Sequence, residues 1–351
     1  MKLLITGGAG FIGSAVVRLA ISRGYSVVNV DALTYASSLR NVEVVAEHPN
    51  YKFVQENICD GAALLRTLKQ YQPDTIMHLA AETHVDRSID DPEKFIQTNV
   101  HGSFNLLEAA RAYWRSNQCP ETFRFHHIST DEVFGSLPNT PNVYFTEDTA
   151  YDPRSPYAAS KASSDHLVRA WYETYGLPIL ITNCSNNYGP HQFPEKFIPI
   201  LILNALAEKP LPIYGNGENI RDWLYVDDHA DALLCVMQKG AVGRSYNIGG
   251  ENEWTNLGLA KTLCSKLDYI LPRQKGSYSD LITFVPDRPG HDLRYAMNSS
   301  RINDELGWQP SVTLENGLEK TIRWFLNNQD WWSHDSANDD FGQRLGLDTL
   351  F

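Results

Sequence analysis

The chain has 351 residues, 42% hydrophobic and 21% charged, which is enough to bury one large core, or one core with a smaller lobe attached. A formal net charge of −12 argues against a broad basic surface, so we expect neither nucleic acid nor an anionic membrane as a partner. The five cysteines lie far apart without a C-x-x-C pair, which favours the cytoplasm over a disulfide framework or a zinc site. The apolar run Met1–Ile5 is too short for a signal peptide and Phe197–Ala207 is too short to span a bilayer, so we expect a soluble cytoplasmic protein.

Short apolar runs alternate with segments of helical periodicity over the first half of the chain. We predict strands near residues 2–6, 26–31, 51–56, 74–80, 123–129 and 178–183, with helices between most of them. This alternation is typical of an α/β protein of Rossmann type with a doubly wound parallel sheet.

The rhythm loosens after Gly189-Pro190, where prolines and a glycine loop predict a separate cap. A further strand at 245–248 indicates that the chain returns to the sheet. We therefore predict a nucleotide-binding domain over residues 1–190, with a returning segment near 224–250. A smaller, partly interleaved substrate-binding domain would take residues 191–223 and 251–351. The tail after Asn327 shows no clear pattern, and we assign it no function.

The first predicted strand runs directly into a glycine-rich loop, Gly7-x-x-Gly10-x-x-Gly13, followed by a helix from Ser14 to Arg23. Glycines let the backbone approach a pyrophosphate, whose charge is stabilised at the helix N-terminus. The second strand ends in Asp31, close to the distance of about 20 residues that a dinucleotide site requires. A carboxylate there accepts from ribose hydroxyls and repels a 2′-phosphate, so NAD is favoured over NADP. The alternative is that Asp31 is only a turn residue.

The strand at 123–129 is followed by Thr130, Asp131 and Glu132, at the sheet edge where open α/β sheets bind ligands. Composition alone favours the alternative that the two acids are solvated loop residues. If they act together as acid and base, their environments must separate their pKa values.

A second catalytic candidate opens a later helix, in which Ser155 is expected as the N-cap and Pro156 as the first helical residue. Tyr157 and Lys161 then share one helical face. Lowering the pKa of tyrosine from about 10 to about 7 needs roughly 4 kcal/mol, which a lysine and a cationic nicotinamide could supply. A Tyr and a Lys at this spacing can also merely decorate a solvated face.

The glycine loop and the Tyr157-x-x-x-Lys161 pair together resemble the extended short-chain dehydrogenase/reductase family. Further segments are similar to one of its branches, the dTDP-glucose 4,6-dehydratases: residues 78–88, 129–135, 186–190, 193–196, 221–223 and 287–292. The resemblance implies a Rossmann-type fold, NAD as cofactor, dTDP-glucose as substrate and a homodimer paired through two helices. We expect these helices to be 95–113 and the one that carries Tyr157, each with an apolar stripe that could also be core.

The resemblance also implies the role of each catalytic residue. Tyr157, assisted by Lys161 and Thr130, takes the proton of the hexose O4 while C4 passes a hydride to NAD. Glu132 then removes the C5 proton and Asp131 protonates the departing C6 hydroxyl.

The remaining site residues are expected from the same resemblance. The cofactor would contact Gly7, Gly10, Phe11, Ile12, Gly13, Asp31, Leu33, Thr34, Asn57, Ile58, Leu79, Ala80, Ala81, Thr83, Thr98, Tyr157, Lys161 and Asn187. The substrate would contact Thr83, Thr130, Asn186, Glu195, Lys196, Phe197, Pro212, Tyr214, Arg221, Asn256, Asp287, Arg288 and His291. We expect no metal site, and we interpret His84, His126 and His127 as structural.

Two positions depart from the family pattern. Asn57 stands where an Asp usually receives the adenine amino group, and its carbonyl oxygen can still accept that bond. Phe134 replaces a Tyr beside the catalytic pair, which removes one hydroxyl and could alter substrate preference.

Two rival functions remain open. A 4-epimerase of the same family would need Tyr157 and Lys161 but not the acid and base pair. A noncatalytic NAD-binding regulator would need neither the Tyr157 and Lys161 pair nor the acid and base pair. UDP-glucose also remains an alternative substrate, because thymine and uracil differ by one methyl group, worth about 1 to 3 kcal/mol.

Overall fold

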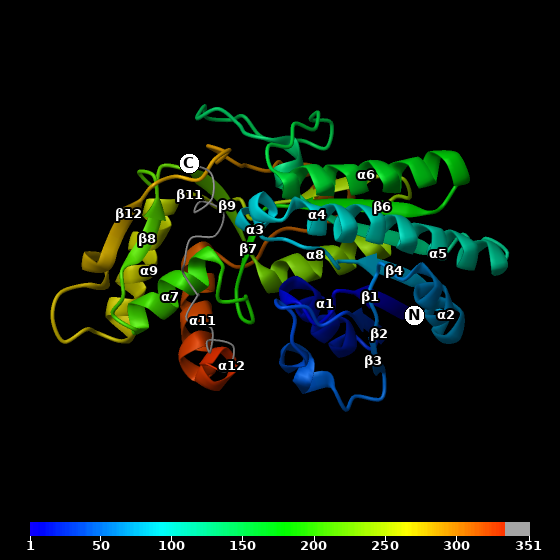
Figure 1. Cartoon of the computed structure of the whole chain (residues 1–351), viewed down its shortest axis with the longest axis horizontal. Coiled ribbons are helices and arrows are strands. Elements are labelled where there is room, and N and C mark those ends of the chain that lie inside the picture. The colour runs from blue at the N-terminus through cyan, green and yellow to red at the C-terminus, as the bar shows by residue number, and fades with distance from the viewer. Residues whose placement is uncertain (334–351) are drawn as a thin grey trace.

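A computed structural model describes residues 1–333 of the chain (Figure 1). Its main sheet has seven parallel strands in the order β10-β6-β5-β4-β1-β2-β3. The strands are β1 (Lys2–Thr6), β2 (Ser26–Asp31), β3 (Tyr51–Gln55), β4 (Thr75–His78), β5 (Arg124–Thr130), β6 (Ile179–Cys184) and β10 (Ser245–Ile248). Each coincides closely with a predicted strand, so the predicted Rossmann-type doubly wound sheet is confirmed.

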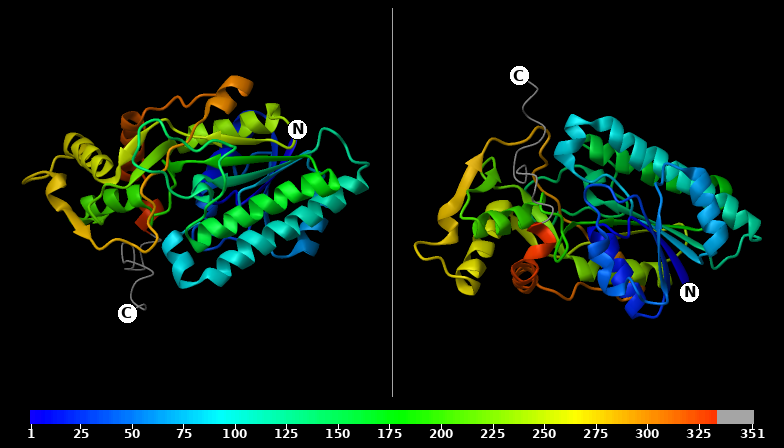
Figure 2. Two further views of the ribbon diagram at one scale, coloured as in Figure 1. Left: turned by 90° about the horizontal axis from the view of Figure 1, so that it is seen from above. Right: turned by 60° about the horizontal axis from the view of Figure 1, so that its bottom comes forward.

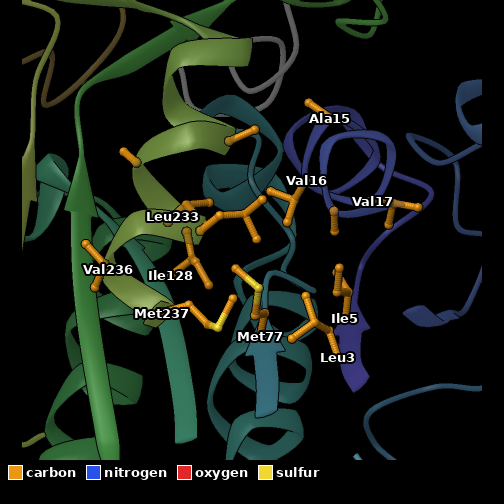
Figure 3. Packing of buried hydrophobic residues seen from close by; sticks show 14 of the residues in the cluster. Leu3, Ile5, Ala15, Val16, Val17, Met77, Ile128, Leu233, Val236 and Met237 are labelled. Atoms are coloured by element: carbon orange, nitrogen blue, oxygen red, sulfur yellow. The ribbon is translucent and has the colours of Figure 1, made fainter. Parts of the chain in front are cut away.

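Helices cover both faces of this sheet. One face carries α1 (Phe11–Ser22) and α8 (Val226–Lys239), and the other carries α2 (Gly61–Tyr71), α5 (Ser103–Ser116) and α6 (Pro156–Tyr175) (Figure 1). Successive strand residues point to opposite faces. Leu3 and Ile5 therefore join the core beneath α1 and α8, shown in Figure 3, whereas Leu4 joins the core on the opposite face. Strands that are buried on both faces, such as β1 and β6, are largely apolar along their length.

The single helix expected from Phe95 to Tyr113 is wrong in detail. The segment begins as α4 (Pro92–Phe95), continues as a π-helix, Ile96–Gly102, and only then becomes α5. Within this segment the Asn99 side chain accepts from the Glu82 backbone N–H at 2.9 Å and donates to the Glu82 carbonyl at 3.0 Å. Such π-helical insertions are frequent at functional sites, and this one brings Thr98 to the wall of a cavity.

A smaller lobe lies beyond the carboxyl ends of the strands, as Figures 1 and 2 show from different sides. Its two small sheets have the strand orders β11-β9-β7 and β12-β8. Its elements are β7 (Asn186–Tyr188), α7 (Phe197–Leu206), β8 (Leu211–Tyr214), β9 (Ile220–Tyr225), β11 (Glu253–Thr255), α9 (Asn256–Ile270), β12 (Ile282–Val285), α11 (Leu314–Asn327) and α12 (Gln329–Ser333). The remaining helical segments are α3 (Val85–Asp90), α10 (Ser300–Leu306) and the 3₁₀ turns Leu39–Val45, Asp131–Phe134 and Tyr278–Leu281.

The two parts are interleaved along the chain. In β9, Trp223 and Tyr225 pack into the core of the lobe, whereas Leu224 packs into the core of the main sheet. The chain then returns through α8 and β10. Ile302 of α10 also packs into the sheet core, although in sequence it lies between the lobe elements β12 and α11. The exact domain boundaries stay a prediction.

The described part of the C-terminal tail is attached to the sheet domain. Trp331 is buried, and its indole N–H donates to the Asn41 side chain at 2.9 Å. The rest of the tail that we left unassigned lies outside the described residues. Among residues 1–333, no helix is long and apolar enough to cross a membrane.

Candidate active site

A cavity of about 330 Å³ opens at the carboxyl ends of the strands, facing the smaller lobe. It brings together residues that are distant in the sequence. Predicted site residues that line it are Gly7, Gly10, Phe11, Ile12, Gly13, Asp31, Thr34, Asn57, Ile58, Leu79, Ala80, Ala81, Thr83, Thr98, Thr130, Asp131, Glu132, Tyr157, Lys161, Asn186, Asn187 and Lys196. Leu33 and most of the expected substrate residues do not line it.

The glycine loop is packed too tightly for side chains. A Cβ on Gly13 would lie 2.1 Å from the Gly7 carbonyl oxygen, and one on Gly7, whose φ is +73°, would lie 2.7 Å from the Ala80 nitrogen. The following helix α1 has Gly10 as its N-cap, without a capping side chain. Its first N–H groups and its positive dipole end therefore face the cavity, where they suit a diphosphate.

Asp31 ends β2 at the wall of this cavity and is 6% exposed. Its carboxylate oxygens accept from the backbone N–H groups of Ala9, at 2.9 Å, and Leu33, at 2.8 Å. An ionised carboxylate has about four acceptor positions, so capacity for ribose hydroxyls remains. Leu33, which stays a predicted cofactor contact, does not line the cavity and helps to fix the Asp31 side chain through its backbone N–H.

Asn57 is placed beside the cavity but already uses its carbonyl oxygen, which accepts from the Cys59 N–H at 2.9 Å. Because a carbonyl oxygen has two lone pairs, one remains for an adenine amino group. Phe134, the other departure, is buried against Phe145 and Tyr151, with ring centroids 5.2 Å away in each case. It packs into a small apolar cluster and does not line the cavity.

The carboxyl end of β5 holds the acidic pair in a defined turn. Thr130 is the N-cap of the 3₁₀ turn Asp131–Phe134, and its hydroxyl accepts from the Glu132 N–H at 3.3 Å and donates to Asp131 Oδ1 at 3.2 Å. Behind the turn, Asn183 of β6 donates to the Thr130 carbonyl at 3.1 Å. The turn fixes two adjacent carboxyl groups at the cavity wall.

The two carboxyl groups have different environments. Burial, followed by the charge of Glu132, raises the pKa of Asp131 well above its usual value. Burial also raises the pKa of Glu132, but the cations of Arg288 and Arg221 oppose that shift. Asp131 is therefore the group that keeps its proton, and Glu132 the one better stabilised as an anion.

Tyr157 and Lys161 lie on the first turns of α6, which Ser155 caps by accepting from the Ala158 N–H at 3.0 Å, as predicted. Tyr157 is 7% exposed and Lys161 is 5% exposed. A catalytic base at pH 7 needs a lowered pKa for Tyr157, as we predicted from the sequence. Burial and the charge of Glu132 instead raise that pKa well above its usual value, although a hydrogen bond with Thr130 opposes them. The protein groups alone thus keep the phenol protonated.

Beneath this pair lies a polar cluster that the sequence argument missed. Asp165 is 2% exposed and accepts from His127 at 3.0 Å, Ser129 at 2.8 Å and Tyr151 at 2.8 Å. Its position, four residues after Lys161 on the same helical face, was a signal that could have indicated it. His127 is structural, as predicted, since it serves as a donor to this buried carboxylate.

Several of the expected substrate residues are held by contacts within the protein. Lys196 donates to the Thr83 carbonyl at 3.1 Å, Arg288 and Tyr214 contact Asp86 at 3.2 and 3.0 Å, and His291 contacts Asp287 at 2.6 Å. Arg221 donates to the Asp292 carbonyl at 2.9 Å and lies 4.1 Å above the Tyr295 ring. The members outside the lining of the cavity are Glu195, Phe197, Pro212, Tyr214, Arg221, Asn256, Asp287, Arg288 and His291.

Several orphaned polar atoms point to a ligand in this region. The buried Asp131 Oδ2, Asn186 Oδ1 and Arg288 Nε have no hydrogen-bond partner, and buried polar groups in proteins usually have one.

Cavity residues that were not predicted from the sequence include Glu82, Ser129, Cys184, Ser185, Gln192 and Phe193. Most follow β4, β5 and β6, so the carboxyl ends of those strands were the available signal. No group of three or more His, Cys, Asp or Glu in the described chain is arranged to hold a metal.

The parallel sheet, the glycine loop and the buried Tyr157 and Lys161 pair define an enzyme of the extended short-chain dehydrogenase/reductase class. The profile of the GDP-mannose 4,6 dehydratase family matches residues 4–321. The chain is 59% identical to a dTDP-glucose 4,6-dehydratase of Neisseria meningitidis serogroup B, over 95% of each chain. It therefore belongs to the nucleotide-sugar 4,6-dehydratases of this family.

Solved structures agree with this assignment. A dTDP-glucose 4,6-dehydratase from Streptomyces venezuelae, crystallised with NAD, matches with a TM-score of 0.87 at 42% identity, over 95% of this chain and 100% of the other. A UDP-glucose 4-epimerase from Thermotoga maritima matches with a TM-score of 0.82 at 31% identity, over 94% of this chain and 100% of the other. The fold alone does not separate the two activities, so the side chains at the site must.

Proposed function

We propose that the chain catalyses the NAD-dependent dehydration of dTDP-glucose to dTDP-4-keto-6-deoxyglucose. The observation that carries the proposal is the Asp131 and Glu132 pair, which is held at the cavity wall beside Tyr157. Within this pair, the pKa of Asp131 is raised further than that of Glu132. A 4-epimerase needs no proton donor for a departing hydroxyl and no base for C5. Its site would leave this buried pair without a task.

The residues around the cavity fit NAD. The glycine loop and the uncapped start of α1 would hold the diphosphate, and Asp31 the adenosine ribose. Bound NAD would supply the hydride acceptor for C4, the donor for C6, and a positive charge that favours the Tyr157 phenolate.

The chain's own groups divide the proton transfers. Tyr157 takes the proton of O4, and Lys161 adds positive charge on the same helical face. The C4 ketone acidifies the C5 proton, which Glu132 removes as a carboxylate. Asp131, which keeps its proton because of its raised pKa, protonates the C6 hydroxyl so that it leaves as water.

The two phosphate charges of the nucleotide sugar require cations near the cavity. Arg221, Arg288 and Lys196 are buried or half-buried close enough to influence Glu132. Arg288 and Arg221 can grip a diphosphate in a bidentate manner. We therefore propose Arg288 and Arg221 as substrate ligands. Arg288 must then release its contact with Asp86 in order to bind the diphosphate.

The test is incubation of the purified protein with dTDP-glucose and, separately, with UDP-glucose. A 4-keto-6-deoxy sugar from dTDP-glucose, formed faster than from UDP-glucose, is expected. A galactose product would support the epimerase instead. If neither sugar gives a product, the result would favour a noncatalytic nucleotide-binding regulator.

We also infer a homodimer through α5 and α6, although part of the predicted apolar stripe is not available for it. Leu106, Leu107 and Ala110 are completely buried in the chain's own core. The apolar residues left at the surface are Phe104, 42% exposed, and Tyr175, 37% exposed. Light scattering at micromolar concentration should give a dimer, and a Phe104→Asp variant should shift it toward monomer.

The proposed activity belongs in the cytoplasm. The described cysteines, Cys59, Cys119, Cys184, Cys235 and Cys264, are all free thiols, as is usual in a reducing compartment.

A further inference from the structure

Three segments meet beside the cavity through Tyr35, Arg87 and Glu195, which we call the Glu195 bridge. The Tyr35 hydroxyl donates to Glu195 Oε1 at 2.9 Å, and Arg87 Nε donates to Glu195 Oε2 at 3.2 Å. Tyr35 lies in the loop after β2, Arg87 in α3, and Glu195 in the segment between β7 and α7. Side chains separated by 160 residues in sequence are thus directly bonded.

The bridge is shielded from solvent on its acidic side. The Glu195 side chain is only 8% exposed, whereas that of Arg87 is 42% exposed. The Arg87 guanidinium lies 4.2 Å above the Tyr35 ring, and Phe193 meets the same ring edge-on at 5.6 Å. Both oxygens of Glu195 are engaged within the protein, one by Tyr35 and one by Arg87, which differs from the substrate contact expected for this residue. Hydrogen bonds to an ionised group are about twice as strong as neutral ones.

The neighbours of the bridge line the cavity from two segments that are distant in the sequence. Thr34 and Ala36, on either side of Tyr35, line the cavity on the side of Asp31. Phe193 and Lys196, on either side of Glu195, line it on the side of the smaller lobe. The bridge thus joins the loop expected to hold the adenosine ribose to the segment that leads into the lobe.

We propose that the Glu195 bridge retains NAD, because the bridge must open before the cofactor can leave the cavity. The inference rests on the proposed function, in which NAD accepts a hydride from C4 and must remain until it returns one to C6. Loss of NADH between these steps would leave the enzyme without its reductant. A side-chain bridge across the two walls slows that loss without contacting the reacting atoms.

The experiment measures the release of radiolabelled NAD from the full chain after addition of excess unlabelled NAD. Tyr35→Phe keeps the ring against Arg87 and Phe193 but removes the hydroxyl, and Glu195→Gln removes the charge. Each is expected to release NAD about 10- to 100-fold faster, the range for a hydrogen bond to a charged group. Tyr269→Phe, at a side chain that is 83% exposed, is the matched control and should release NAD at the parent rate.

The double variant separates a bridge from two unrelated structural effects. If the two side chains act through one bond, Tyr35→Phe combined with Glu195→Gln should release NAD no faster than the faster single variant. Multiplicative effects would overturn the proposal, and so would a Tyr35→Phe variant with the parent release rate. In both cases a parent that converts dTDP-glucose leaves the proposed function intact, whereas a parent that binds no NAD overturns both. Thermal unfolding curves confirm that the variants are folded.

Discussion

Lys161 Nζ donates a hydrogen bond of 2.8 Å to the backbone carbonyl of Ile128, two residues before Thr130. The bond joins the first turns of α6 to the end of β5. The helix that carries Tyr157 and the turn that carries Asp131 and Glu132 are thereby held in one geometry. The two halves of the proposed reaction, oxidation at C4 and loss of water, thus depend on groups that are fixed together but can be altered separately.

Substitution of Asp131 should stop the reaction after oxidation. Asp131→Asn keeps the size of the side chain but removes the proton donor, so the C6 hydroxyl leaves slowly. We expect bound NADH to accumulate in a single turnover, which its absorbance reports. An Asp131→Asn variant that turns over like the parent would remove Asp131 from the mechanism.

Substitution of Tyr157 should stop the reaction earlier. Tyr157→Phe removes the base for the O4 proton, and we expect the rate to fall by about 10² to 10⁴. No NADH should form on the enzyme, in contrast to Asp131→Asn, when both are mixed with substrate in the same apparatus. Equal accumulation of NADH in the two variants would contradict this division of roles.

Asp31 should determine the choice of cofactor. Asp31→Ser removes the carboxylate that opposes a 2′-phosphate, so binding of NAD should weaken and discrimination against NADP should relax. Titration calorimetry with both cofactors measures the change. The same selectivity after substitution would mean that Asp31 only fixes the loop through its bonds to Ala9 and Leu33.

The buried Asp165 should stabilise the fold in a pH-dependent way. Burial raises the pKa of Asp165, but the hydrogen bond and charge of His127 and the charge of Lys161 outweigh burial and hold that pKa below its usual value. A carboxyl group with a lowered folded-state pKa stabilises the protein above its unfolded pKa, and this contribution is lost as the pH falls through the folded-state pKa.

Asp165→Asn should therefore cost about 1.5 to 3 kcal/mol near pH 7, the range for hydrogen bonds to a charged group. The difference from the parent should shrink below about pH 4. Urea unfolding at several pH values measures both effects. Asp148→Asn, at a side chain that is 87% exposed, is the control and should change the stability by less than about 0.5 kcal/mol. A pH-independent loss in Asp165→Asn would indicate a packing defect instead.

Local sequence determined the sheet strands and the cofactor loop. Strands such as β1 and β6 are largely apolar because parallel strands are buried on both faces, and such runs are visible without any partner. Gly7, Gly13 and the Ser155 cap were also readable, because turn geometry and capping depend on residues close in the chain. The acidic pair was found because it follows a strand end directly.

Only the tertiary structure decided how the site is held. Glu195 belongs to a bridge with Tyr35, and Asp165 accepts from His127, because side chains far apart in sequence are brought together by the crossing of strands and helices. The π-helix at Ile96–Gly102 likewise carries Asn99, whose side chain bonds to the distant backbone of Glu82. The pKa of Tyr157 is raised because burial and the charge of Glu132 act on it, and neither can be read from the spacing of Tyr157 and Lys161. Sequence spacing fixes which residues share a strand or a helical face, whereas burial and charge at a site depend on every element packed around it.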